Sequence, residues 1–136
     1  IAAFKADGSQ KEPVWENKTR AYVPSMLISN GHLYAVLDAG IAMCWKVETG
    51  EELWKERLGG TFTSSPVLVG ENIFVTSEDG KTHIFKASPD GFESVGENEL
   101  GDEVFATPVF CGNRIYTRVA HRNGDSRQEM LYCLGK

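Results

Sequence analysis

The feature that most constrains the fold of this chain is an internal repeat of about 42 residues. Pro24, Pro66 and Pro108 are spaced by 42 and 42 residues. Each proline is followed by an apolar run, a turn rich in Asn and Gly, and a pair of aliphatic and aromatic residues that ends at Tyr34, Phe74 or Tyr116. A repeat of this length is typical of an array of supersecondary units that bury their apolar faces against one another.

Each unit is predicted to form four short strands, because its segments are rich in β-branched and aromatic residues and are separated by Gly, Asn and Asp. A four-stranded antiparallel unit that recurs at this spacing is the signature of a β-propeller blade. We therefore predict an all-β fold. The expected strands are residues 13–18, 23–29, 32–37, 41–47, 52–57, 62–69, 72–77, 82–87, 92–99, 104–111, 114–121 and 129–134, with 1–6 as a further candidate.

The repeat divides the chain into residues 1–20, the end of a preceding blade, two blades at 21–59 and 60–101, and an incomplete blade at 102–136. Propellers close with about four to eight blades, so we expect the chain to be a piece of a longer protein. Residues 13–18 are expected to form a fourth strand without a partner. Because open sheet edges promote pairing, we predict that isolated chains associate head to tail.

Two dipeptides, Asp79-Gly80 and Asn123-Gly124, are predicted to lie at hairpin tips. Both are residue pairs that accept positive φ at the two central positions of a type I′ turn. An Asp at such a tip could ligate a cation, but the sequence has no Asp-x-Asp-x-Asp run to support a calcium loop. These dipeptides therefore indicate turns rather than a metal site.

The segment 44–54 carries a more specific pattern, in which a turn at Thr49 and Gly50 is followed four residues later by Trp54. Gly50 can take the positive φ of such a turn. Trp54 is predicted to bury its ring between neighbouring blades and to donate its N–H to a backbone carbonyl. Trp15 is expected to do the same for the preceding blade, whereas Trp45 could lie either between blades or on the surface.

This segment resembles the tryptophan-docking motif of the pyrroloquinoline-quinone-type (PQQ-like) β-propeller repeat. It departs from that motif at Lys46, where an Asp is usual. The second unit keeps Asp90-Gly91 but has Val95 in place of the tryptophan. The repeat as a whole covers nearly the entire chain, while the full motif occurs once.

The resemblance implies a family that includes quinoprotein dehydrogenases, BamB-type outer-membrane assembly scaffolds and other exported proteins. It therefore implies a periplasmic or exported location. PQQ and calcium are the cofactors that it implies for a dehydrogenase with a complete ring. We expect neither in this chain, because no two cysteines adjoin and the acidic residues and Asn show no recognisable ligand spacing.

No residue is predicted to be catalytic, cofactor-binding or metal-ligating. His32, His83 and His121 are interpreted as solvated histidines at strand ends, since no nucleophile motif accompanies them. No two of the three cysteines, Cys44, Cys111 and Cys133, have the spacing of a Cys-x-x-Cys pair. Cys44 and Cys133 occupy equivalent positions in the first and third units, which separates them by a blade, and we interpret them as small buried apolar residues.

Composition excludes several functions. The 14 Lys and Arg against 19 Asp and Glu give a net charge of −5 without a basic cluster, which disfavours a nucleic-acid partner. The longest apolar stretches, 33–37 and 41–45, are far shorter than the roughly 20 residues of a membrane-spanning helix. We therefore expect neither nucleic-acid binding nor a membrane span.

The sequence favours a non-catalytic scaffold that presents loops to a protein partner or ligand, because propellers hold many loops on a rigid frame. One alternative is a fragment of a PQQ-dependent quinoprotein dehydrogenase. Another is a sensor domain of a larger signalling protein. Fold alone does not choose among them.

Overall fold

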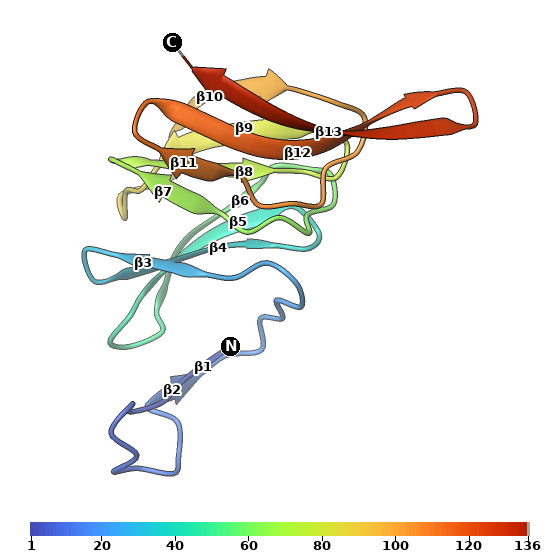
Figure 1. The fold of residues 1–136 in the computed structure, drawn as a ribbon. Helices are drawn as coiled ribbons and strands as arrows, with labels where there is room; N and C mark the ends of the chain where they lie inside the picture. The colour runs from blue at the N-terminus through green and yellow to red at the C-terminus, as the bar shows by residue number, and fades with distance from the viewer. Residues whose placement is uncertain (136) are drawn as a thin grey trace.

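The computed structural model describes residues 1–135, which form thirteen strands in four antiparallel sheets (Figure 1). The prediction of an all-β fold built from four-stranded antiparallel units is confirmed. An amino-terminal pair contains β1 (Ala2–Ala3) and β2 (Trp15–Glu16). Blade one contains β3 (Leu27–Ser29), β4 (His32–Leu37), β5 (Ile41–Lys46) and β6 (Glu52–Arg57). Blade two contains β7 (Val67–Val69), β8 (Asn72–Thr76), β9 (Lys81–Lys86) and β10 (Ser94–Glu99). Blade three contains β11 (Val109–Cys111), β12 (Arg114–Asn123) and β13 (Ser126–Gly135).

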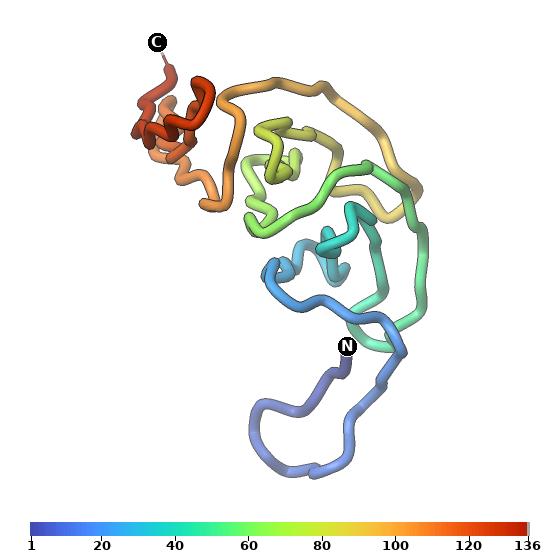
Figure 2. The backbone as a smooth tube through the Cα atoms, turned by 90° about the vertical axis from the view of Figure 1, so that its right-hand side faces the viewer, coloured from blue at the N-terminus to red at the C-terminus, as the bar shows by residue number. Residues whose placement is uncertain are grey.

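The sheets follow one another along an arc, as in part of a propeller ring (Figure 2). Within each blade the strands pair in chain order. Side chains of β4 and β5 are buried on both faces because blade one lies between two neighbours. Tyr34 and Cys44 pack toward blade two, whereas Leu33 and Trp45 pack with Trp15 of the amino-terminal pair. Trp45 is 1% exposed, so it belongs to the core between blades.

Several expected strands are shorter in the structure. Residues 62–66 and 104–108 are connections rather than the beginnings of β7 and β11. The amide of Phe62 donates to the carbonyl of Asp38, and the amide of Val104 donates to the carbonyl of Glu78, each at 2.9 Å. These segments therefore bond to the preceding blade instead of joining their own sheet.

The three repeated prolines are all buried but are not all equivalent. Pro66 and Pro108 come directly before β7 and β11, whereas Pro24 lies three residues before β3. The register shows the true correspondence, since Leu27 and Val67 occupy the same position in their hairpins. Blades one and two are thus related by 40 residues, and the connection to blade one has two extra residues between its proline and its first strand.

Asp79 and Gly80 lie in the β8–β9 hairpin turn as predicted, but the type I′ geometry is wrong at both dipeptides. Asn123 pairs with Ser126, which places Gly124 and Asp125 at the tip, and only Gly124 has positive φ. Asp79 likewise lacks the positive φ that the turn requires. Positive φ at both central residues occurs instead at Asn30 and Gly31, at 48° and 77°, in the β3–β4 hairpin.

Residues 13–18 do not form an unpartnered strand. Trp15 of β2 pairs with Ala3 of β1, so the amino-terminal segment is a short two-stranded ladder. The far edge of β13 has no neighbouring strand within residues 1–135. Association of chains through such edges stays a prediction.

No helix among residues 1–135 has the length and apolar character needed to span a membrane.

Candidate protein-binding face

One end of the blades collects all the segments that connect one blade to the next, at the right of Figure 1. Residues 20–26 lead into blade one, and residues 58–66 and 100–108 lead into blades two and three. The turns at 38–40 and 77–80 lie at the same end, together with the tip of the β12–β13 hairpin. We call this surface the loop face.

Hydrogen bonds tie neighbouring connections of the loop face to one another. The amide of Ser25 donates to the hydroxyl of Ser65 at 2.9 Å, and the amide of Ser65 donates to the hydroxyl of Thr107 at 2.9 Å. The carboxylate of Asp38 accepts the amides of Tyr22 and Val23 at 2.9 and 3.1 Å. The connections are therefore held in a fixed row across three blades.

The row presents apolar side chains to solvent. Tyr22 is 75% exposed, Val23 57% and Phe105 44%. Val23 and Phe105 occupy corresponding positions, because Val23 lies two residues before Ser25 and Phe105 lies two residues before Thr107 in the hydrogen-bonded row. Exposed aromatic and aliphatic side chains on rigid loops are typical of surfaces that bind other proteins.

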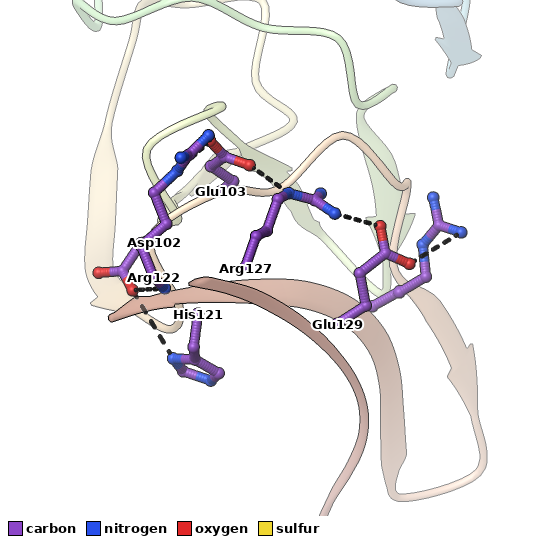
Figure 3. Close-up of polar contacts among 7 residues, drawn as sticks. Asp102, Glu103, His121, Arg122, Arg127 and Glu129 are labelled. Carbon is purple, nitrogen blue, oxygen red and sulfur yellow. Dashed lines mark hydrogen bonds and ion pairs between the residues drawn. The ribbon is translucent and has the colours of Figure 1, made fainter. Parts of the chain in front are cut away.

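The β12–β13 hairpin extends the loop face outward, since its strands have ten residues each where β4 and β5 have six. Its side chains form an ion-pair network (Figure 3). Glu103 accepts hydrogen bonds from Arg122 and Arg127, and Arg127 also pairs with Glu129 at 2.8 Å. Hydrogen bonds from Arg127 and then from Arg122 hold the pKa of Glu103 below its usual value.

The network continues at the base of the hairpin. The carboxylate of Asp102 accepts the amide of Arg122 at 2.8 Å and lies 3.9 Å from Nδ1 of His121. Nε2 of His121 lies 2.9 Å from the hydroxyl of Tyr132 on the opposite strand. Charged and polar groups thus fix the hairpin to the connection that precedes blade three.

The tryptophans of the repeat motif lie between blades, where they make the scaffold rigid. The indole N–H of Trp15 donates to the carbonyl of Val47 at 2.6 Å, and its ring lies against Gly50. Gly50 has a φ of 70°, and the hydroxyl of Thr49 accepts the amide of Glu51 in the same turn.

Trp54 occupies the corresponding place one blade later. Its indole N–H donates to the carbonyl of Ser88 at 2.8 Å. Its ring packs with Tyr34, Phe85 and Phe92, whose centroids lie 5.9 to 6.3 Å from it. Trp15 and Trp54 therefore each join one sheet to the next.

The residue that replaces the tryptophan in blade two is Gly96, not Val95. Trp54 lies opposite Cys44 in blade one, and Gly96 lies opposite Ile84, the residue of blade two that corresponds to Cys44. A register shift between Ser94 and Gly96 displaces Val95 from the ladder. Blade one has the same register shift between Cys44 and Trp45, so the spacing failed because the turn before β10 has seven residues, 87–93, whereas the turn before β6 has five, 47–51.

The interpretation of the histidines as solvated is wrong for His83, which is buried. Its Nδ1 lies 3.0 Å from the carboxylate of Glu97, and its ring packs 5.9 Å from that of Phe62. Burial lowers the pKa of His83, although the Glu97 charge opposes the shift. His32 is partly buried, and its Nδ1 is buried without a hydrogen-bond partner.

The cysteines are all free. Cys44 is buried, and burial raises the pKa of its thiol to about 11. Cys133 is exposed, so its interpretation as a buried residue is wrong. No sheet covers that side of blade three in the described chain.

Within residues 1–135 there is no group of three or more His, Cys, Asp or Glu arranged to hold a metal ion. Tyr22, Val23 and Phe105 carry no motif that marks them in the sequence, although the repeat places them in corresponding connections. Exposure is the property that marks them, and it depends on how the blades stack.

A profile of the family described as outer membrane protein assembly factor BamB matches residues 1–91. A curated relative from Legionella pneumophila (strain Paris), outer membrane protein assembly factor BamB, is 27% identical over 104 residues. That match covers 76% of this chain and 26% of the relative, so the chain spans about a quarter of the relative's length.

Two solved structures share the fold. The crystal structure of BamB from Moraxella catarrhalis aligns with a TM-score of 0.56 and 18% identity, over 69% of this chain and 28% of that one. A europium-containing methanol dehydrogenase aligns with a TM-score of 0.53 and 16% identity, over 66% of this chain and 19% of the enzyme. One blade architecture thus occurs in an assembly factor and in an enzyme.

Proposed function

The chain belongs to the family of the outer membrane protein assembly factor BamB, and we propose that it is part of a non-catalytic propeller scaffold that binds a protein through its loop face. Its relative's description as an assembly factor supports this proposal. The same description supports a periplasmic or exported location, where such a scaffold would meet unfolded or partly assembled outer membrane proteins.

The observation that carries the proposal is the exposure of Tyr22, Val23 and Phe105 on hydrogen-bonded connections. A fixed backbone lowers the entropy lost on binding, and aromatic side chains supply much of the binding energy at protein interfaces. The neighbouring Arg122 and Arg127 are held by carboxylates, so they would provide a polar rim rather than a free basic patch.

Complementation tests this function with the full-length protein. In a strain that lacks this protein, we expect the amount of folded outer membrane β-barrel protein to fall. The wild-type gene should restore that amount. A double variant, Tyr22→Ser with Phe105→Ser, should fail to restore it at equal abundance. Val14→Ser is the matched control, because Val14 is 49% exposed but lies outside the loop face.

Two results would contradict the proposal. Full restoration by the double variant would exclude the loop face as the binding surface. Saturable, calcium-dependent binding of PQQ to the full-length protein would favour a quinoprotein dehydrogenase instead. Titration of PQQ with and without calcium, followed by calorimetry, therefore accompanies the complementation test.

A further inference from the structure

The two interfaces between blades are packed differently. At the first, between blades one and two, the buried cluster includes Val36, Phe62, Val75 and Phe85, and Trp54 packs against it. At the second, between blades two and three, the strand registers and the matching connections place smaller or more polar residues at the corresponding positions. In order, these are Thr76 for Val36, Val104 for Phe62, Thr117 for Val75, Leu134 for Phe85 and Gly96 for Trp54.

The second interface consequently contains a cavity of about 410 Å³. Phe74 and Leu134 both line it, and they correspond to Tyr34 and Phe85, which hold the ring of Trp54 in the first interface. Most of the remaining wall is apolar and includes Phe110. A cavity of this size lies within the range of sites that bind small organic molecules.

The polar groups in the cavity wall restrict the hydrogen-bonding groups and the charge of a ligand that could bind there. Thr76, Thr82 and Thr117 contribute hydroxyls that can accept a hydrogen bond from a ring N–H. Among the described residues that line the cavity, none is Lys or Arg and one, Glu99, is acidic. An anionic ligand would therefore enter an apolar site without a counter-ion, which is costly.

We propose that the cavity between blades two and three binds a small, neutral, planar aromatic molecule of about the size of indole. The ring would lie between Phe74 and Leu134, in the place that the indole of Trp54 takes in the neighbouring interface. Its polar edge would face the threonine hydroxyls. This inference does not depend on protein binding by the loop face.

Calorimetric titration of indole into the full-length protein tests the proposal. We expect saturable binding with one site, and at least tenfold weaker binding of indole-3-acetate because of its carboxylate. Absence of saturable indole binding, or equal binding of the two compounds, would overturn the proposal.

Two substitutions in β10 test where indole binds. Gly96→Trp should fill the interface and weaken indole binding at least tenfold, since a Cβ at Gly96 meets no atom within 4 Å and φ is not positive there. Val95→Trp is the matched control, because Val95 is adjacent but 49% exposed and lies in the register shift, outside the ladder position that corresponds to Trp54. Indole affinity should be unchanged in that variant. Unchanged affinity in folded Gly96→Trp would contradict the assignment.

A crystal structure of the full-length protein soaked with indole gives a readout that does not depend on either variant folding. A ring between Phe74 and Leu134 is the expected result. A ring bound elsewhere, or another part of the chain filling the cavity, would overturn the inference.

Discussion

The indole N–H of Trp54 in blade one donates to the carbonyl oxygen of Ser88 in blade two, 2.8 Å away. Trp15 makes the same bond to Val47 one interface earlier, at 2.6 Å. A single side chain thus supplies both apolar contact and a directional bond across each of these boundaries. The sheets on either side of these two boundaries are therefore held at a defined spacing.

Removal of the Trp54 ring should strongly destabilise the protein. We expect Trp54→Ala to lower the free energy of unfolding by about 3 to 5 kcal/mol, because a large packed side chain is deleted. Trp54→Phe should cost less, about 1 to 3 kcal/mol, since it keeps a ring but leaves the Ser88 carbonyl without its donor. Urea unfolding followed by circular dichroism measures both. Equal stability of wild type and Trp54→Ala would contradict the anchoring role.

The contact between Gly50 and Trp15 predicts a cost for any side chain at residue 50. A Cβ there would lie 2.5 Å from Cδ2 of the Trp15 ring. Gly8 is a matched control, since its φ of 68° resembles the 70° of Gly50 but nothing lies within 4 Å of its Cβ position. Both alanine variants should carry the left-handed backbone penalty of about 1 to 2 kcal/mol. Thermal unfolding should show an additional cost of about 1 to 3 kcal/mol for Gly50→Ala alone.

Stability should fall in mild acid because of His83. Burial lowers the pKa of His83 in the folded protein below its ordinary value of 6.5. As the pH decreases below that value, the histidine is protonated in the unfolded chain before it is protonated in the folded protein. The free energy of unfolding therefore decreases until the pH passes the folded pKa. Lys81, Asp79 and Glu97 are the other ionisable groups around this histidine.

The measurement is the free energy of unfolding of wild type and His83→Gln between pH 7.5 and about pH 5. The difference between the two proteins should change with pH, to the disadvantage of wild type at the acid end. Parallel pH profiles would show that His83 does not contribute.

The cysteines should differ in reactivity. Cys44 is buried and burial raises the pKa of its thiol to about 11, so little thiolate is present at neutral pH. Cys111 and Cys133 are exposed. An aromatic disulfide reagent at pH 8 should therefore label two thiols rapidly in the folded chain and the third only after denaturation. Rapid labelling of all three would indicate that the first interface opens readily.

Isolated chains are expected to associate through their open sheet edges. The far edge of β13 offers backbone donors and acceptors over ten residues, without a neighbouring strand in the described chain. Sedimentation of the isolated chain should show association that increases with concentration. A single monomeric species at high concentration would contradict this.

The repeat of the sequence was sufficient to predict the blades, because strand-forming segments and turn residues recur at a spacing that only a few folds use. The same repeat identified Trp15, Gly50 and Trp54, since a turn glycine and a large aromatic residue can be recognised from composition and spacing alone. It could not place the residue that replaces tryptophan in blade two. Both blades have the same register shift at this strand, but the turn that precedes it has seven residues in blade two and five in blade one, and the motif does not fix that length.

Burial and exposure were decided by the tertiary structure. His83 lies at the start of an ordinary-looking strand, but Phe62 of the connection folds over it, and that contact comes from the stacking of blades. The sequence did not mark Tyr22 and Phe105 as exposed, because the path of the connections turns them toward solvent. The cavity beside Phe74 likewise exists only between two sheets. Local patterns determine which strands form, whereas the fit of one sheet against the next determines what each side chain meets.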